Sequence, residues 1–519
     1  MNSRFYDKNG REWFSEPPVR RRRDAANVIH ANMGRATPCA VKDTILETWE
    51  LFLPDSTLEK MVRYSQQKAD QLGLSIQLTI VQLKAYCAIL YYRGVFGDQH
   101  VPIEQLWGDN YSSFYRTTMS RTLFQIWNKV FRFDNAEDRS NRKVTDTFAA
   151  IREIWAEWNE KLKLFHIPSH SITIDEQLVA SRCRSPHRIY NPAKPGKYGE
   201  LVRWCADASN RYFLNGSPLT KRPSDPEAAI QHRDSNKAKN LVLDLCAPFL
   251  DEGRNVTGDR FFTAVDTAEE LLRRRTTYLG TMTKNKRDIP PTLHETRPKY
   301  DSTFVFGGER KQITLQSYQL NRAKKVYLLS TMHHDPTTQQ EGKLKSDLQL
   351  YYNETKAGVD IVDEMCKRYS TRTSVQRWPV VHFQNILDVT AINVFTIFNQ
   401  THPRWNSSPE NKRRRSFLQE LSNQLAKANM VSRLRDPVGL SNEIVTNLAQ
   451  ATGLPNPRMI HQSVDGAGDT TTVRRCQRCK DNGKPARNSN QTPYQCSSCH
   501  QPVCKSHYKI TAVTCTSCL

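Results

Sequence analysis

Ser171-Ile-Thr-Ile-Asp175 is the stretch at which the chain changes from a helical to a mixed pattern. Apolar and polar residues alternate in it, which predicts a short strand. Leu201-Val-Arg-Trp-Cys-Ala-Asp207 predicts a second strand, and Arg211–Leu214 predicts its hairpin partner, with the turn at Ala208-Ser-Asn210. These strands indicate that a sheet enters the fold here.

Strands and helices continue to alternate beyond the hairpin. The expected elements are a helix at Lys239–Leu250, a strand at Asn255-Val-Thr257, a helix from about Thr263 and a strand at Thr277–Met282. This order is typical of an α/β core, which we expect to begin near residue 198. Upstream, residues 43–165 carry apolar residues at three- and four-residue spacing, which predicts a helical layer.

The whole pattern predicts a multidomain α/β protein. Residues 285–346 interrupt the core with expected strands at Ser302–Phe306, Gln312–Leu320 and Lys325–Met332. The expected segments are a basic arm (1–42), a helical domain (43–197), the first part of the core (198–284), a β-rich insertion (285–346), the second part of the core (347–402), a helical segment returning to the helical domain (403–435), a linker (436–475) and a cysteine-rich domain (476–519).

The composition favours a polyanion partner. Lysine and arginine exceed acidic residues by 22 among 519 residues, and release of phosphate counterions drives such proteins onto nucleic acid. DNA and RNA explain the charge equally well. No stretch approaches the roughly 18–20 uninterrupted apolar residues of a membrane helix, and no secretory signal is visible. We therefore expect an intracellular protein with no membrane partner.

Four aspartates are candidate ligands of a hard metal ion. Asp207 closes an expected strand, Asp259 follows another, and Asp360 and Asp363 are three residues apart on one expected helix face. Clustered carboxylates suit Mg²⁺, and two such ions stabilise the attacking and leaving oxygens of a phosphodiester displacement. Turn caps and a solvated helix face explain the same residues without a metal.

Seven of the thirteen cysteines lie in the last 44 residues. Four ligand pairs with two-residue gaps predict two tetrahedral zinc sites. The hypothesis interleaves them as in RING and PHD modules, with Cys476, Cys479, Cys504 and His507 at one ion and Cys496, Cys499, Cys515 and Cys518 at the other. Disulfides are the alternative, and they are disfavoured inside a cell.

Several segments, in chain order, resemble the piggyBac transposase family. They are Ser171–Gln177, Pro195–Tyr198, Leu214–Gly216, Gly253–Thr263, Gly280–Arg287, Leu329–His334, Tyr352–Asp360, Ile361–Cys366 and Arg377–Pro379. The resemblance implies an RNase H-like catalytic core, a β-rich insertion, a helical dimerisation and DNA-binding domain, and a cross-brace zinc domain. It also implies that Asp207, Asp259 and Asp360 are catalytic, with Asp363 in support.

The implied activity is cut-and-paste transposition in the nucleus by a homodimer. Such enzymes nick transposon ends, form and open hairpins through the freed 3′-hydroxyl, and join the ends to TTAA targets, using two Mg²⁺ (or Mn²⁺) ions beside two structural zinc ions. The resemblance also assigns DNA contacts to Arg377 and Trp378. In the zinc domain, phosphate contacts would come from Arg474, Arg475, Lys480, Lys484, Arg487 and Lys505. A core tryptophan is the alternative for Trp378.

The sequence departs from the family around the aspartates. Arg260 follows Asp259 where relatives usually have asparagine, so it could contact phosphate or compete for the carboxylate; Ala206 and Ala357 are further departures. Two other hypotheses therefore stay open. One is a domesticated DNA-binding protein that does not cut, and the other is a zinc-dependent chromatin or ubiquitin module.

Overall fold

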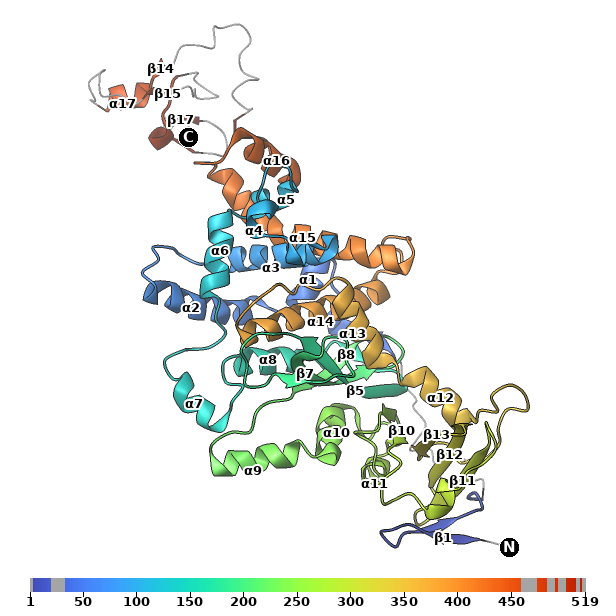
Figure 1. Ribbon diagram of the computed structural model, residues 1–519. Coiled ribbons are helices and arrows are strands. Elements are labelled where there is room, and N and C mark those ends of the chain that lie inside the picture. Colours follow the sequence, from blue (N-terminus) through green and yellow to red (C-terminus); the bar gives the residue numbers. More distant parts are fainter. Residues whose placement is uncertain are drawn as a thin grey trace. The chain divides into compact units, whose positions relative to one another are not determined.

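The computed structural model describes residues 3–19, 33–458, 474–482, 491–492, 501–509 and 514–515 (Figure 1). The chain divides into two compact units. The first comprises residues 1–80, 90–100 and 130–421, and the second comprises 81–89, 101–129 and 422–519. The candidate carboxylates fall in the first unit, and the cysteine-rich segment falls in the second.

The segment after residue 43 is helical, as its periodicity predicted. The first helix begins with a capping box, in which Thr44 Oγ1 accepts from the Glu47 N–H and the Glu47 carboxylate accepts from the Thr44 N–H. The helices are α1 (Ile45–Glu50), α2 (Asp55–Gln71), α3 (Ile80–Phe96), α4 (Ile103–Leu106), α5 (Ser113–Thr118), α6 (Arg121–Val130), α7 (Arg139–Thr145) and α8 (Arg152–Leu162).

A large mixed sheet organises the first unit. Its strands are β1 (Arg4–Tyr6), β2 (Glu12–Phe14), β5 (Ser171–Ala180), β6 (Ile189–Tyr190), β7 (Tyr198–Asp207), β8 (Phe213–Pro218), β9 (Asn255–Gly258), β10 (Thr277–Met282), β11 (Ser302–Gly307), β12 (Ile313–Asn321) and β13 (Lys324–Ser330). The spatial order is β1-β2-β11-β12-β13-β10-β9-β5-β7-β6, with β8 also paired to β7. β5, β9 and β10 are parallel neighbours, and the other pairs are antiparallel. A separate two-stranded sheet joins β3 (Arg35–Ala36) to β4 (His166–Ile167).

The prediction of a mixed α/β fold is confirmed, and the strands expected within 285–346 are present as β11, β12 and β13, but the start of the core near residue 198 was placed too late. The central strands of the sheet begin at Ser171 and not near residue 198, because β5 pairs with both β7 and β9. The strands expected at residues 285–346 continue the same sheet, because β13 pairs with β10. The β-rich insertion is therefore an extension of the core sheet.

The first residues also belong to this sheet, which corrects the prediction of an extended arm over 1–42. β1 and β2 form a hairpin, and β2 pairs with β11 through Phe14 and Phe306. Trp13 is fully buried against Gly307, where an added Cβ would come 2.8 Å from the indole. Arg11 pairs with Glu269. Residues 4–14 are thus anchored in the core, while 20–32 lie outside the described residues.

Helices cover both faces of the central strands (Figure 1). Trp204 of β7 packs on Trp155 and Trp158 of α8, whereas the next residue, Cys205, faces Cys246 of α10. This alternation assigns each strand residue to one face. The remaining helices of this unit are α9 (Pro226–Ser235), α10 (Ala238–Cys246), α11 (Val265–Arg273), α12 (Asp347–Thr355), α13 (Gly358–Arg368) and α14 (Trp378–Thr401).

α14 is the one described helix that is long and apolar enough to cross a membrane. However, 94% of its most apolar window is buried inside the protein. That burial is typical of a core helix.

The second unit contains a helix that the sequence reading had treated as linker. α16 (Asn442–Thr452) begins at Ser441, whose side chain accepts from the Ile444 N–H, and ends at Gly453 in the left-handed region. It pairs with α5 through Arg116 and Glu443, 2.9 Å apart. The other elements near the C-terminus are α15 (Glu410–Arg435), β14 (Arg474–Arg475), α17 (Gln477–Asp481), β15 (Gln491–Thr492), β16 (Tyr508–Lys509) and β17 (Thr514–Cys515).

Candidate functional site

Asp175 and Asp259 lie at the same level of two adjacent parallel strands. In the β5–β9 ladder, Ile174 is the partner of Gly258. Asp175 is the next residue of β5, and Asp259 directly follows the end of β9. Partners in a parallel ladder project from the same face of the sheet, so these two carboxylates are neighbours.

α13 brings Asp360 to the same face. Its first residue, Gly358, lies so close to β5 that an added Cβ would come 2.3 Å from Thr173 Cγ2. Thr173 and Asp175 are two residues apart on β5 and therefore share a face. Asp360 is in the first turn of α13, with its side chain 65% exposed. Asp175, Asp259 and Asp360 form what we call the carboxylate site.

The carboxylate site has the electrostatics of a cation site. Burial, followed by the charges of Asp360 and Asp259, raises the pKa of Asp175 to about 7. Burial also raises the pKa of Asp259, although backbone N–H groups of Phe261 and Phe262 oppose that rise. Buried carboxylates that repel one another in this way are suitable ligands for a hard divalent cation, because the cation would neutralise their repulsion.

Lys194 is a basic residue beside these acids. Its Nζ donates to the Glu176 carbonyl at 2.9 Å and lies 4.0 Å from Asp360 Oδ1. Its charge lowers the pKa of both Asp175 and Asp259. The sequence reading missed Lys194, although the residue lies directly before the quoted segment Pro195–Tyr198.

Asp207, the first predicted catalytic residue, does not belong to this site. Its partner in the β5–β7 ladder is Ile172, three residues before Asp175. Three residues of strand span about 10 Å, and an odd offset places Asp207 on the opposite face. Asp207 lies on the face of Cys205, whereas Asp175 is the ladder partner of Trp204 on the other face.

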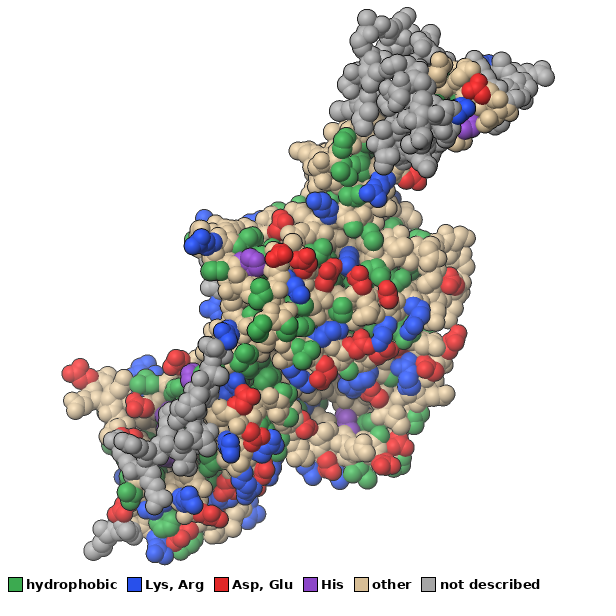
Figure 2. Space-filling view, turned by 180° about the vertical axis from the view of Figure 1, so that it is seen from behind, with side chains coloured by type: hydrophobic (Ala, Val, Ile, Leu, Met, Phe, Trp, Pro, Cys, Tyr) green, Lys and Arg blue, Asp and Glu red, His purple; other side chains and the backbone are tan. Residues whose placement is uncertain are grey.

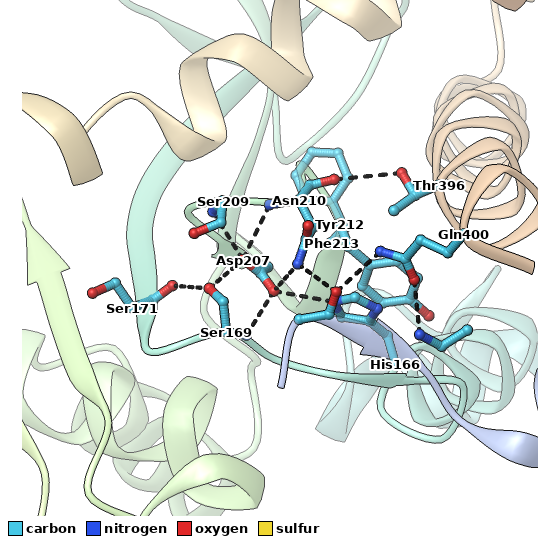
Figure 3. A network of polar contacts seen from close by, with 12 residues as sticks. His166, Ser169, Ser171, Asp207, Ser209, Asn210, Tyr212, Phe213, Thr396 and Gln400 are labelled. Carbon is cyan, nitrogen blue, oxygen red and sulfur yellow. Dashed lines mark hydrogen bonds and ion pairs between the residues drawn. The ribbon is translucent and has the colours of Figure 1, made fainter. Parts of the chain in front are cut away.

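The Asp207 carboxylate is moreover saturated by protein donors, as Figure 3 shows. Oδ2 accepts from His166 Nε2 at 3.0 Å, the Ser169 N–H at 2.8 Å and Asn210 Nδ2 at 3.1 Å. Oδ1 accepts from Ser169 Oγ at 2.6 Å and from the N–H groups of Ser209 and Asn210. Six donors fill the acceptor capacity of a carboxylate, so no position is left for a metal.

The network around Asp207 has a structural role. Asn210 Nδ2 also donates to the Gly34 carbonyl, and Gln400 of α14 bonds both Gly34 and Ala36 (Figure 3). Burial alone would raise the pKa of Asp207, but hydrogen bonds from His166 and Ser169 outweigh it and lower the pKa to about 2. Asp207 therefore joins three segments that are distant in the sequence.

Asp363 differs from its predicted supporting role, whereas a DNA contact by Arg260 stays a prediction. Asp363 lies one turn beyond Asp360, is buried, and pairs with Lys367 of its own helix. Arg260 is exposed, and the described contacts contain no ion pair between it and Asp259. Its charge lowers the pKa of Asp259 from a distance. Arg260 therefore does not occupy the Asp259 carboxylate, which stays available to a cation.

Trp378 packs in the core. Its ring lies 5.3 Å from Phe148, 4.8 Å from His187 and 5.8 Å from His382, and the residue is 8% exposed. These contacts agree with the alternative of a core tryptophan, and stacking on a DNA base stays a prediction. The neighbouring Arg377 donates to the backbone carbonyl of Phe131, which holds the start of α14.

A second cluster lies in the cysteine-rich segment. The ligand atoms of Cys476, Cys479, Cys504 and His507 all lie within 4.8 Å of one another. Cys479 and Cys504 are 3.7 Å apart at sulfur, and His507 Nδ1 is 3.4–3.6 Å from the three sulfurs. Zinc–sulfur bonds of about 2.3 Å give a tetrahedral edge of roughly 3.8 Å, so the cluster fits a zinc site.

The structure describes less of the other predicted zinc site. Cys496, Cys499 and Cys518 lie outside the described residues, as do Lys484 and Arg487, and Cys515 is placed only as part of β17. Arg474 lies in β14 and Lys480 in α17, and Lys505 begins a short 3-10 turn; Arg475 of β14 is half-buried.

Basic and acidic side chains are mixed on one face of the molecule. On the face drawn in Figure 2, lysine and arginine side chains are interspersed with acidic ones. That face therefore has no single basic patch to which nucleic acid binding could be assigned.

Comparison with known proteins gives a consistent result. Residues 46–395 match the family described as Transposase IS4. The chain is 22% identical, over 395 residues, to the human PiggyBac transposable element-derived protein 3, and 22% identical to the human Chimeric ERCC6-PGBD3 protein. Each match covers 70% of this chain, and the chain spans 65% and 36% of those relatives. A solved piggyBac transposase synaptic complex with hairpin DNA superposes with a TM-score of 0.74 at 27% identity, covering 93% of this chain and 99% of that one.

Proposed function

Because the chain belongs to the piggyBac-type transposases of the Transposase IS4 family, we propose that it cuts and joins DNA at the carboxylate site. In this proposal Asp175, Asp259 and Asp360 are the catalytic carboxylates, and Asp207 has a structural role. The observation that carries this proposal is the convergence of three acids on one face of the sheet, with the pKa of Asp175 raised to about 7.

The three carboxylates would hold divalent cations, Mg²⁺ or Mn²⁺. When bound, two such ions activate the attacking oxygen and stabilise the leaving oxygen of an in-line phosphodiester displacement. Lys194 lies beside the same acids and keeps a partly exposed ammonium, which can donate to a phosphate oxygen. We assign Lys194 to positioning the DNA backbone.

The reaction sequence that follows is cut-and-paste transposition. Water attacks a phosphodiester at the transposon end, the P–O3′ bond breaks, and a 3′-hydroxyl is released. That hydroxyl attacks a phosphodiester of the opposite strand, whose P–O3′ bond breaks as the hairpin forms. Water then opens the hairpin and restores the 3′-hydroxyl, which attacks a phosphodiester of a TTAA target and breaks the P–O3′ bond there. We further propose that the protein acts in the nucleus as a homodimer, and that its cysteine-rich segment binds zinc and recognises transposon ends.

The decisive experiment is excision of a reporter flanked by the DNA that adjoins the coding region. Asp175→Asn and Asp259→Asn should each lower excision about a hundred- to a thousandfold while end binding persists, because they remove charge at the reacting centre. Glu364→Gln, which removes an exposed acid one residue beyond Asp363, is the matched control and should excise normally.

Two outcomes would contradict the proposal. Normal excision by Asp175→Asn would remove that residue from the catalytic site. Retained end binding without excision by the wild type would instead favour the domesticated, non-cutting protein.

A further inference from the structure

A cleft of 920 Å³ lies directly beside the carboxylate site. The two share walls, because Gln177 of β5 lines the cleft two residues beyond Asp175, and Asp363 of α13 lines it one turn beyond Asp360. Two strand residues span about 7 Å. A DNA strand with its phosphate at the carboxylates would therefore place a neighbouring nucleotide at the cleft.

Gln384 supplies an unused acceptor in this cleft. The residue is 1% exposed, and its Nε2 donates to Thr373 Oγ1 at 3.0 Å. Its Oε1 is buried with no hydrogen-bond partner among the described residues. Buried polar atoms are almost always paired, so an unpaired acceptor in a cleft wall points to a ligand that donates a hydrogen bond.

Arg372 supplies an unused cation. Arg372 lines the cleft, and its guanidinium makes no ion pair within the described part of the chain, whereas Lys367 is already paired with Asp363. Burial lowers the pKa of Arg372, although the charges of Asp388 and Asp363 oppose that change. Such a guanidinium, which is always protonated and carries several donors, suits a phosphate group.

The segment that carries Arg372 is held in place. Asp388 of α14 accepts from Ser370 Oγ and from the Thr371 N–H, both at 2.7 Å. At the rim of the cleft, Arg182 and Arg184 are exposed. The site therefore combines a fixed cation, a buried acceptor and a basic entrance.

We propose that this cleft receives one unpaired nucleotide next to the cut site, with Arg372 on its phosphate and Gln384 Oε1 accepting from its base. Ligand pockets span roughly 300–1,000 Å³, and the cleft is within that range. Enzymes that act on DNA commonly move a nucleotide out of the base stack into such a pocket. The inference rests on the proposed function, because it assumes a DNA strand at the carboxylates.

The test is photo-crosslinking of the full chain to a TTAA duplex that carries one unpaired 4-thiothymidine, without added magnesium. Crosslinked peptides should map to residues 370–385. Arg372→Gln should lower crosslinking about tenfold, because it removes the phosphate contact. Ser374→Trp, which fills the exposed mouth of the cleft, should do the same without a change of charge.

Arg368→Gln is the matched control, since Arg368 is exposed and lies outside the cleft. It should crosslink as the wild type does, and all variants should keep the wild-type melting temperature. Crosslinks that map elsewhere, or equal crosslinking of Arg372→Gln and Arg368→Gln, overturn the cleft proposal alone. Failure of the wild type to retain the duplex overturns the proposed function along with it.

Discussion

Two aspartates on neighbouring strands have opposite environments. Asp207 receives six hydrogen bonds and has a pKa of about 2, whereas Asp175 faces two other acids and has a pKa of about 7. A carboxylate with every acceptor position filled stabilises a fold, and one that is buried beside like charges suits an external cation. The environment of each carboxylate therefore separates its role from that of its neighbour.

Asp207→Asn should destabilise the protein by about 2–4 kcal/mol, because an amide nitrogen would face the N–H donors of His166 and Ser169. The effect should depend on pH. The folded pKa, about 2, lies below the ordinary value of 3.8, so the stabilisation is present above pH 4 and is lost as pH falls towards 2. That contribution amounts to about 2 kcal/mol. Urea unfolding between pH 3 and pH 7 measures it.

Asp251→Asn is a suitable control for this experiment. Asp251 also has a lowered pKa, through a hydrogen bond from Arg274, but it lies on the surface. Its loss should change stability little at any pH. Equal unfolding midpoints for Asp207→Asn and the wild type would show that the network is dispensable.

The sequence could not separate Asp175 from Asp207. Both follow apolar, alternating stretches, and both belong to expected strands. What separates them is the register of β5 against β7 and β9, which depends on residues far apart in the chain. A local signal did exist, because Asp175 ends the expected strand 171–175 and Asp259 lies two residues after the expected strand 255–257.

Among the elements, α13 decides whether the carboxylate site is assembled. The helix reaches β5 only because Gly358 has no side chain at the contact with Thr173. Helix and strand positions were largely predicted by periodicity. Periodicity did not predict the pairing of β13 with β10, because strand pairing joins residues that are far apart in the sequence. The continuity of the insertion with the core sheet was therefore not predicted either.

Gly358→Ala should therefore displace α13 and with it Asp360. We expect the overlap with Thr173 Cγ2 to destabilise the protein by about 1–3 kcal/mol. We also expect the variant to lose excision activity while it still binds DNA. Adding Thr173→Ser removes the clashing methyl group and should restore most of the excision. If the double variant is as inactive as Gly358→Ala alone, the contact does not position Asp360.

At the scale of the whole molecule, the two metal-binding candidates differ in how the sequence encodes them. Cys476, Cys479, Cys504 and His507 were grouped from their spacing together with the interleaved order of RING and PHD modules, and the structure brings the same four together. Zinc ligands occur in close sequence pairs, so geometry constrains the spacing directly. The carboxylates come from strands and a helix that are dozens of residues apart, so only the fold brings them together.

Cys504→Ser should lower the zinc content by about one equivalent per chain, because it removes one of four ligands. End-specific DNA binding should be lost with it, whereas the unfolding transition of the first unit should be unchanged. Cys39→Ser, at an exposed thiol outside the cluster, is the control and should keep full zinc. Metal analysis of the two purified proteins decides the question, and an unchanged zinc content in Cys504→Ser would exclude the site.

The hairpin of β1 and β2 has a consequence for the order of folding during synthesis. Its partner strand, β11, is encoded almost three hundred residues later, since Phe14 pairs with Phe306. At translation rates of about 5–20 residues per second, the hairpin waits roughly fifteen seconds to a minute on the ribosome before its neighbour emerges. Trp13 and an unpaired strand edge stay uncovered during that time, which makes this short segment a natural binding site for a nascent-chain chaperone.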